Sequence, residues 1–246
     1  MDKMLFIAMN GAKQAMQAQN SISHNLANAS TVGFKADLDS FTNWHVAGPG
    51  YNTRVYSQLQ SEGNNLLPGN YATTDRELDV AVQGDGWIAV QGSDGNEAYT
   101  RAGDLRLDAS GRLTTGAGFA VIGNSGPIVI PQAQKIEIGA DGSISMIAIG
   151  QTSESLAVVD RIKLVNLGKD QIEKGPEGLM HSLDGQLVPP SAGVTLASGV
   201  LEQSNVNAVS ELIGLIQIAR QYEANVKLMG TAKENDEVSA RLLRGS

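Results

Sequence analysis

The two ends of this 246-residue chain carry helical patterns, and a glycine-punctuated region with strand patterns lies between them. Near each end, small or apolar residues recur at steps of three and four, which places them on one narrow face of a helix. The N-terminal seam holds Leu5, Ala8, Ala12, Ala15, Gln19, Ile22 and Leu26. The C-terminal seam holds Leu212, Leu215, Ala219, Tyr222, Val226 and Met229. Two such helices favour a subunit whose ends pack together and against neighbours.

The bounds of these helices follow from capping and turn residues. The first is predicted to run from about Lys3 to Asn28 and to break in residues 30–34, where Ser, Thr and Gly favour turns. The second begins around residues 205–208, where Ser204, Asn205 and Asn207 can each act as the N-cap. Small and polar seam residues bury little apolar area, so we expect both helices to depend on packing and to be largely disordered in a dilute monomer.

Strand patterns dominate the middle of the chain. Residues 78–83 alternate apolar and polar side chains, and Asp-Gly pairs at 94–95 and 141–142 separate apolar runs as hairpin turns do. No helical crossovers interrupt these strands, which favours an antiparallel sheet. The predicted fold class is α+β, with N- and C-terminal helices pairing as a coiled coil around a central antiparallel all-β domain. The predicted domains are 1–34 with 201–246 (paired helices), 35–72 (connector) and 73–200 (β domain).

Composition narrows the functional class. The chain has 18 Lys and Arg against 26 Asp and Glu, a net charge of -8, which disfavours nucleic acid or anionic lipid as a partner. It has no cysteine, which excludes disulfides, thiolate metal sites and cysteine nucleophiles. The apolar run at residues 5–9 is shorter than a secretory signal core of about 7 to 15 residues. No stretch approaches the roughly 18 apolar residues of a membrane span, so no membrane insertion is expected.

A polar stripe lies beside the first seam, formed by Ser21, Asn25 and Asn28. Asparagine lowers helix propensity, so amides are an unusual choice for a merely solvated face. One interpretation is an amide ladder that hydrogen-bonds neighbouring subunits and sets their register. The other is an exposed face with helix-end capping, which accounts well for Asn28 and poorly for Asn25.

Several motifs resemble those of the flagellar rod and hook family. Residues 25–35 read NLANASTVGFK, and residues 204–209 and 220–223 read SNVNAV and RQYE. Between them, LDVAVQGDGW at 78–87 and YTRAGDL at 99–105 are similar to motifs of the family's central domain. Within the family, the single modest β domain and SNVNAV most resemble the proximal-rod type. The close competitor is the distal-rod type, which tends to carry an aromatic GxGFF at the position of residues 84–88.

This resemblance implies a bacterial axial protein that polymerises through its terminal helices into a torque-carrying rod. It further implies export through the flagellar type III apparatus without cleavage, a periplasmic location, and proximal and distal rod subunits as partners. Paired terminal helices would form an inner tube, with the β domain facing outward. The expected assembly interface adds Asn25, Asn28, Asn205 and Asn207 to the apolar seam residues.

Enzymatic interpretations have weaker support. His24, His45 and His181 lack metal-ligand spacing, and turn or strand-edge positions explain Asp75, Asp79 and Asp85 better than glycoside hydrolysis does. No catalytic residue, metal or cofactor is therefore predicted. Two alternatives stay open: a distal-rod or hook-type axial protein, and a secreted β-rich carbohydrate-binding protein or cell-wall hydrolase. The second would use Trp87 and Tyr99 as sugar-stacking platforms.

Overall fold

The computed structural model describes residues 3–45, 55–150 and 156–244. The chain divides into two compact units. The helical unit comprises Met1–Ala29, Asp37–Asn64 and Val206–Ser246, and the β unit comprises Ser30–Ala36 and Asn65–Asn205. Both units therefore draw on segments that are far apart in the sequence.

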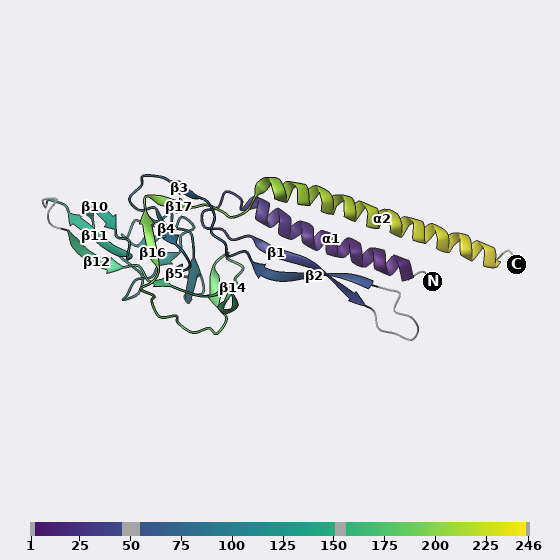
Figure 1. Cartoon of the computed structure of the whole chain (residues 1–246), viewed down its shortest axis with the longest axis horizontal. Helices are drawn as coiled ribbons and strands as arrows, with labels where there is room; N and C mark the ends of the chain where they lie inside the picture. Colours follow the sequence, from purple (N-terminus) through teal and green to yellow (C-terminus); the bar gives the residue numbers. More distant parts are fainter. Residues whose placement is uncertain (1–2, 46–54, 151–155, 245–246) are drawn as a thin grey trace. The chain divides into compact units, whose positions relative to one another are not determined.

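In the helical unit, α1 (Lys3–Ala27) and α2 (Ala208–Arg244) lie side by side (Figure 1). A long antiparallel hairpin of β1 (Asp37–His45) and β2 (Val55–Asn64) packs on α1. This hairpin falls inside the segment that we expected to be a connector. The predicted domain boundaries stay a prediction, but the hairpin's contacts are those of a packed element.

Polar side chains of α1 hold the hairpin in place. The Asn10 Nδ2 group donates to the carbonyl oxygen of Ser57 at 2.7 Å, and the Leu59 amide donates to Gln14 Oε1 at 2.7 Å. A small apolar cluster of Ala15, Ala18 and Ile218, with Ile22 and Leu59 packed against it, joins both helices and the hairpin. Amides on a helix thus substitute for a neighbouring strand, because they satisfy main-chain groups of β2.

The β unit consists of short strands and one 3-10 turn. They are β3 (Tyr71–Thr73), β4 (Val80–Gln83), β5 (Trp87–Gln91), β6 (Glu97–Thr100), β7 (Arg106–Leu107), β8 (Leu113–Thr114), β9 (Ala120–Val121), β10 (Ala133–Ile138), β11 (Ser143–Ala148), β12 (Ala157–Arg161), β13 (Leu164–Val165), η1 (Lys169–Gln171), β14 (Ile172–Lys174), β15 (Met180–Ser182), β16 (Thr195–Ser198) and β17 (Val200–Glu202).

The largest sheet of this unit has the order β14-β15-β6-β5-β9-β8-β7, with β13 paired to β5. A three-stranded sheet has the order β10-β11-β12, and the pairs β16-β4 and β17-β3 complete the unit. The strand pairs within the described ranges are antiparallel. The predicted fold class is therefore confirmed.

Strand β5 shows why the sequence is so apolar here. Its Ile88 and Val90 face the main core, while Trp87 and Ala89 face a second, smaller cluster with Tyr99. A strand covered on both faces needs a continuous apolar run instead of alternation. Burial of the Tyr99 phenol raises its pKa to about 12.

Aspartate-glycine turns connect many of the strands. Gly95, Gly111 and Gly142 have φ values of 82°, 81° and 85°, in the left-handed region that favours glycine. Ahead of two of them, the side chains of Asp108 and Asp141 accept amide hydrogen bonds from residues two positions on. These bonds, with those from serine hydroxyls, lower the pKa of both carboxyls. The hairpin turns predicted at 94–95 and 141–142 are thus confirmed.

Candidate assembly interface

The face of α1 toward α2 is built from small side chains. Ala8, Ala12, Ala15 and Ala18 are buried along it. A Cβ atom added at Gly11 would lie 3.0 Å from the side-chain nitrogen of Asn225 on α2. Alanine and glycine let the two helices approach closely, but they contribute little apolar area per residue. The two helices are therefore in close contact, but their contact contributes little to the stability of the helical unit.

The face of α2 toward α1 repeats every seven residues. Glu211, Ile218, Asn225 and Ala232 occupy this position, and the latter three are in contact with α1 or buried. Seven-residue spacing is the period of helices that pack along a shared seam. The sequence predicts Leu212, Ala219 and Val226 on the seam, and each of these follows a member of the observed repeat by one residue. Two of the four residues in this repeat, Glu211 and Asn225, are polar. A search for regularly spaced apolar residues therefore finds the neighbouring face of α2 instead.

The predicted interface residues differ in exposure within the isolated chain. Ala8, Ala12, Ala15 and Asn25 are buried. The half-buried members are Ile22, Leu26, Asn28, Asn205, Leu215, Ala219 and Met229. The exposed members are Leu5, Asn207, Leu212, Tyr222 and Val226. Their contacts with neighbouring subunits stay a prediction.

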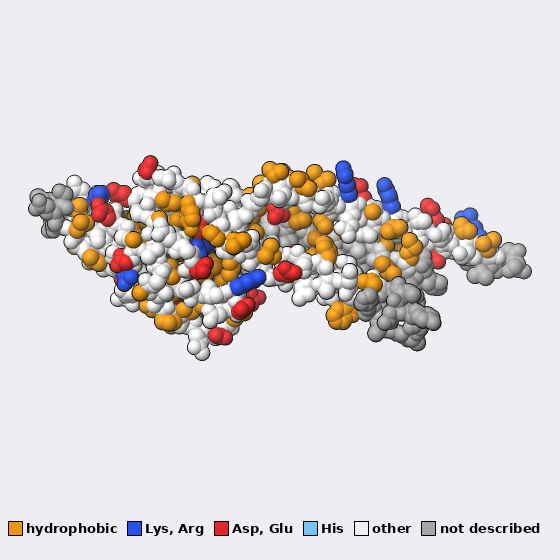
Figure 2. All heavy atoms as spheres, viewed as in Figure 1, with side chains coloured by type: hydrophobic (Ala, Val, Ile, Leu, Met, Phe, Trp, Pro, Cys, Tyr) orange, Lys and Arg blue, Asp and Glu red, His pale blue; other side chains and the backbone are white. Residues whose placement is uncertain are grey.

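Large apolar side chains lie on the outer faces of both helices. On α1, Phe6, Met9 and Met16 are 57%, 53% and 59% exposed, and Lys13 lies between them on the same face. We call Phe6, Met9, Lys13 and Met16 the outer stripe. At the start of α2, Val209, Leu212, Ile213 and Ile216 are also exposed, and Figure 2 shows hydrophobic side chains gathered there. Exposed apolar patches of this kind mark surfaces that bind other proteins.

Asn25 has partners inside its own unit. Its Oδ1 accepts from the Asp37 amide at 2.9 Å, its Nδ2 donates to the Asp37 carbonyl at 3.0 Å, and Glu211 Oε1 lies 3.5 Å away. The side chain therefore pairs with the first residue of β1 as a strand would. Next to it, His24 Nδ1 lies 2.7 Å from Asp37 Oδ2. The amide ladder between subunits is not required to satisfy Asn25.

The other predicted asparagines also contact their own chain. Asn28 Nδ2 donates to the His24 carbonyl at 2.9 Å, at the end of α1. Asn207 is the N-cap of α2: its Oδ1 accepts from the amides of Val209 and Ser210 at 3.1 and 3.2 Å. In the β unit, Asn205 accepts from the Ala36 amide and donates to the carbonyls of Asn65 and Leu67.

A buried charge cluster, missed in the sequence, lies in the β unit. Glu202 Oε1 lies 2.6 Å from Lys35 Nζ, and Glu202 Oε2 lies 3.0 Å from Arg101 Nη1. The side chains of Glu202, Lys35 and Arg101 are 0%, 1% and 4% exposed. Glu202 also accepts the Gly69 amide, Lys35 donates to the Leu67 carbonyl and Arg101 donates to the Gly84 carbonyl, while the buried Nε of Arg101 has no partner among the described residues. Burial lowers the pKa of Lys35, and the bond to Glu202 opposes that shift.

This cluster holds together the two segments that connect the β unit to the helices. Residues 30–36 follow α1 and residues 203–205 precede α2, and Lys35 and Glu202 tie the two segments side by side. The Gly33 amide adds a bond to the Glu202 carbonyl at 2.8 Å. At Gly33, φ is +68° and an added Cβ would lie 2.3 Å from the Arg101 carbonyl carbon. Only glycine fits there.

Comparison with known proteins identifies the family. Three family models match: Flagella basal body rod protein at residues 5–35, Flagellar hook protein FlgE/F/G D1 domain at 81–146, and Flagellar basal body rod FlgEFG protein C-terminal at 197–242. The chain is 37% identical to the flagellar basal-body rod protein FlgF of Escherichia coli, over 99% of both chains. The chain belongs to the flagellar basal-body rod protein family. It is also 36% identical to FlgF of Salmonella typhimurium (99% of both chains) and 34% to FlgG of Buchnera aphidicola (94% of this chain, 95% of that one).

The motifs that carried the family resemblance meet in the charge cluster. Gly33, Phe34 and Lys35 come from the first motif, and Arg101 comes from YTRAGDL. The Phe34 ring lies under Lys174 Nζ at 4.0 Å, and the Arg101 guanidinium lies 5.2 Å from the Trp87 ring. In this rod-family chain, distant motifs thus build one structural site.

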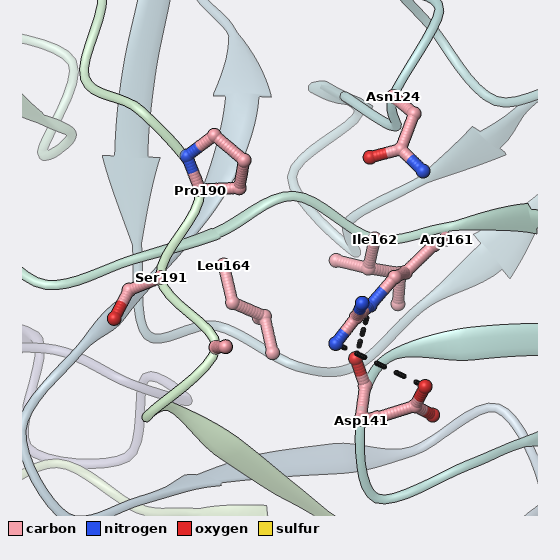
Figure 3. Close-up of a pocket in the computed structure, with 8 residues that line it drawn as sticks. Asn124, Asp141, Arg161, Ile162, Leu164, Pro190 and Ser191 are labelled. Carbon is pink, nitrogen blue, oxygen red and sulfur yellow. Dashed lines mark hydrogen bonds and ion pairs between the residues drawn. The ribbon is translucent and has the colours of Figure 1, made fainter.

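Rod-family membership makes this a structural protein, not an enzyme. One pocket of the β unit is lined by both polar and apolar side chains (Figure 3). It measures about 130 Å³, and its Arg161 side chain turns to Asp141, donating to the Asp141 carbonyl at 2.8 Å. This volume is below the about 300–1,000 Å³ of small-molecule sites.

Two further findings bear on the alternatives. Trp87 and Tyr99 are 3% and 1% exposed, so neither can stack on a sugar. Over residues 3–45, 55–150 and 156–244, no three His, Cys, Asp or Glu side chains are grouped to hold a metal ion. Neither described helix has the length and apolarity needed to cross a membrane.

Proposed function

We propose that this chain is a FlgF-type subunit of the proximal rod, which polymerises through its terminal helices to form part of the flagellar drive shaft. The observation that carries this proposal is the likeness to FlgF proteins along 99% of both chains. Likeness to FlgG proteins is slightly lower and covers 94% of this chain. The distal-rod alternative is therefore the nearest competitor.

The structure supports polymerisation through the helices. The helical unit buries small side chains between α1 and α2 and leaves large apolar ones outside. Such surfaces are stabilised when neighbouring subunits cover them. The partners we propose are further copies of this chain and other proximal and distal rod subunits. The β unit, with its own core, would face away from the rod axis.

The charge cluster supports a role in carrying torque. A drive shaft needs stiff connections between the part that polymerises and the rest of each subunit. Hydrogen-bonded buried charges are costly to separate, because each would be left unpaired in a low dielectric. The cluster therefore resists separation of the two connecting segments.

For export, we propose passage through the flagellar type III apparatus without cleavage of a signal peptide, followed by assembly in the periplasm. The thin packing of the helical unit supports this route, since a weakly stabilised helix pair unfolds at low energetic cost. Predicted disorder of the free helices would also delay polymerisation until rod partners are present.

Gene deletion and complementation test the proposal. Deleting the gene should abolish swimming and stop the axial structure beyond the inner-membrane ring, and a tagged copy should restore both and co-purify with isolated basal bodies. Complementation of a FlgG deletion instead of a FlgF deletion would favour the distal-rod alternative. Normal flagella in the deletion strain, with a defect only in cell-wall turnover, would overturn the structural assignment.

A further inference from the structure

A groove opens within the helical unit between α1, α2 and the base of the hairpin. It measures about 240 Å³, which is the size of a side chain and below that of a small-molecule site. Ile22, Phe41, Leu59 and Ile218 provide apolar walls. The carboxylates of Asp37, Asp39 and Glu211 line it as well. We call this the acidic groove.

Three carboxylates line the groove: Asp37 lies 2.7 Å from His24 Nδ1, whereas Asp39 and Glu211 lack a cationic partner in the described part of the chain. Neither Asp39 nor Glu211 forms an ion pair there, and no lysine or arginine lines the groove. Glu211 is partly buried, and its contact is the 3.5 Å approach to Asn25. Desolvation raises the pKa of Glu211, as expected for a carboxylate without a cation. A cationic side chain with apolar flanks would complement this groove.

The outer stripe of α1 has that chemistry. Lys13 is exposed, with Met9 four residues before it and Met16 three residues after it on the same face. Helix α1 contains no acidic residue, so Lys13 has no carboxylate on its own helix. By contrast, Lys227 on α2 has Glu223 four residues before it. Among the lysines and arginines of residues 4–27 and 208–242, whose side chains the structure describes, Lys13 is the one with large apolar side chains on either side and no local counter-charge.

We propose that the acidic groove of one copy receives Lys13 from the outer stripe of a second copy, with the Lys13 ammonium beside Glu211 and Asp39 and the flanking methionines against the apolar residues at the groove's edge. This inference rests on the proposed function, since it presumes that copies meet in a rod. The stripe and the groove are different surfaces, so the contact is heterologous. A heterologous contact that does not close into a ring generates an open helical polymer.

The energetics favour such a contact in the polymer and not in the dilute monomer. Covering the methionine side chains removes apolar surface from water, which stabilises the contact between copies. Pairing Lys13 with the groove relieves the uncompensated burial of Glu211. Like-charge contacts would disfavour other registers, so the pair also sets specificity.

Cross-linking between two copies tests this contact directly. The natural chain has no cysteine, so every thiol is an introduced one. One tagged copy carries Met16→Cys on the stripe, and a second copy carries Asp39→Cys at the groove. Co-expressed in the deletion strain and treated with a short bismaleimide, isolated basal bodies should yield a cross-linked dimer. Soluble monomer at low concentration should not.

A matched control uses the opposite face of the hairpin. Gln60 is exposed on β2 beside groove-lining Leu59 and does not line the groove. Met16→Cys with Gln60→Cys should cross-link about tenfold less, the factor equivalent to ~1.4 kcal/mol of contact preference. Equal yields from both pairs, or no dimer in basal bodies that contain both variants, would overturn the groove assignment.

Charge exchange provides the second test. Lys13→Glu should reduce swimming by placing like charges together, and Lys13→Arg should preserve it. Combining Lys13→Glu with Asp39→Lys should restore part of the loss, because both changed positions are exposed and the pair is rebuilt with reversed sign.

If cells carrying Lys13→Glu swim normally, the proposed contact is wrong even though the rod assignment stands. If the tagged wild-type protein is absent from basal bodies, the proposed function fails first. Cross-linking of Met16→Cys only to another rod protein would assign the stripe to that partner and refute a second copy.

Discussion

The two units of this subunit use their apolar residues in opposite ways. The β unit has a core of large buried side chains, including Ile88, Leu105 and Tyr99, and leaves others such as Leu67 and Leu187 exposed at its surface. The helical unit buries alanines between its helices and leaves Phe6 and Met16 outside. A unit that encloses its large apolar side chains can fold alone, whereas one that exposes them is completed by neighbours. We therefore expect the β unit to fold without partners and the helical unit to be stabilised by contacts with neighbouring subunits.

The largest effect on stability is expected when the buried carboxylate of the charge cluster in the β unit is removed. Glu202→Gln leaves Lys35 and Arg101 without their counter-charge, and breaking such a pair costs about 3–5 kcal/mol. We expect the urea midpoint of the β unit to fall sharply, measured by Trp87 fluorescence in a Trp44→Phe background. The control Glu137→Gln removes an exposed partner of Lys135 and should leave the midpoint unchanged. Equal effects of both variants would show that the cluster does not hold the β unit together.

A backbone test follows at the same site. Gly33→Ala combines a left-handed backbone, costing about 1–3 kcal/mol, with overlap on the Arg101 main chain, which adds about 1–3 kcal/mol. Gly95→Ala has a φ of +82° but open space around its Cβ position, so only the first kind of cost applies. Denaturation of both variants should show a clearly larger loss for Gly33. A smaller loss at Gly33 than at Gly95 would contradict the close approach.

The sequence predicted more of the β unit than of the helical interface. Asp-Gly turns and the apolar run of β5 are local signals, and they placed strands and hairpins correctly. The charge cluster joins positions 35, 101 and 202, and single charged residues are usually exposed. Lys35 and Arg101 lie inside two of the family motifs and Glu202 lies just before a third, which was the available signal. Three of the six predicted seam residues of α2, Leu212, Ala219 and Val226, lie one residue beyond the repeat that faces α1, because Glu211 and Asn225 occupy packing positions there. The other three, Leu215, Tyr222 and Met229, lie four residues after members of that repeat, on the same side of the helix. The apolar character of a helix face does not show whether that face packs within the subunit or contacts a neighbouring subunit.

Asn25 tests whether the amides of α1 act inside the subunit. Asn25→Leu would leave the amide and carbonyl of Asp37 unpaired, at a cost of about 1–3 kcal/mol to the helical unit. Thermal unfolding followed by helical circular dichroism should detect this loss. Asn20→Leu, at an exposed position on the same helix, should be neutral or slightly stabilising. An unchanged Asn25→Leu monomer that fails to assemble would return this residue to a role between subunits.

The outer stripe should show the reverse behaviour. Met9→Ser removes an exposed side chain, so the free energy of unfolding of the monomer should change by only about 0.5 kcal/mol. Incorporation into basal bodies should nevertheless drop, because that side chain is buried only in the polymer. Ala15→Ser, at a fully buried position between the helices, should instead weaken the monomer. Normal incorporation of Met9→Ser would mean that this face stays exposed in the rod.

The smallest expected effect is a pH dependence confined to the helical unit. Glu211 is partly buried in the groove, and desolvation raises its pKa above the ordinary value of 4.5, against the bond from Asn25. A carboxyl whose pKa is raised by folding binds its proton more tightly in the folded state. Its contribution to stability is complete below pH 4.5 and is lost as pH rises through the folded value. Mild acidification from neutral should therefore slightly stabilise the α1–α2 pair, and Glu211→Gln should remove that dependence.

If a second copy places Lys13 in the groove, the charged carboxylate of Glu211 becomes favoured instead, so the sign of the pH dependence should reverse in assembled rods. The same sign in monomer and rod would separate Glu211 from any contact between subunits.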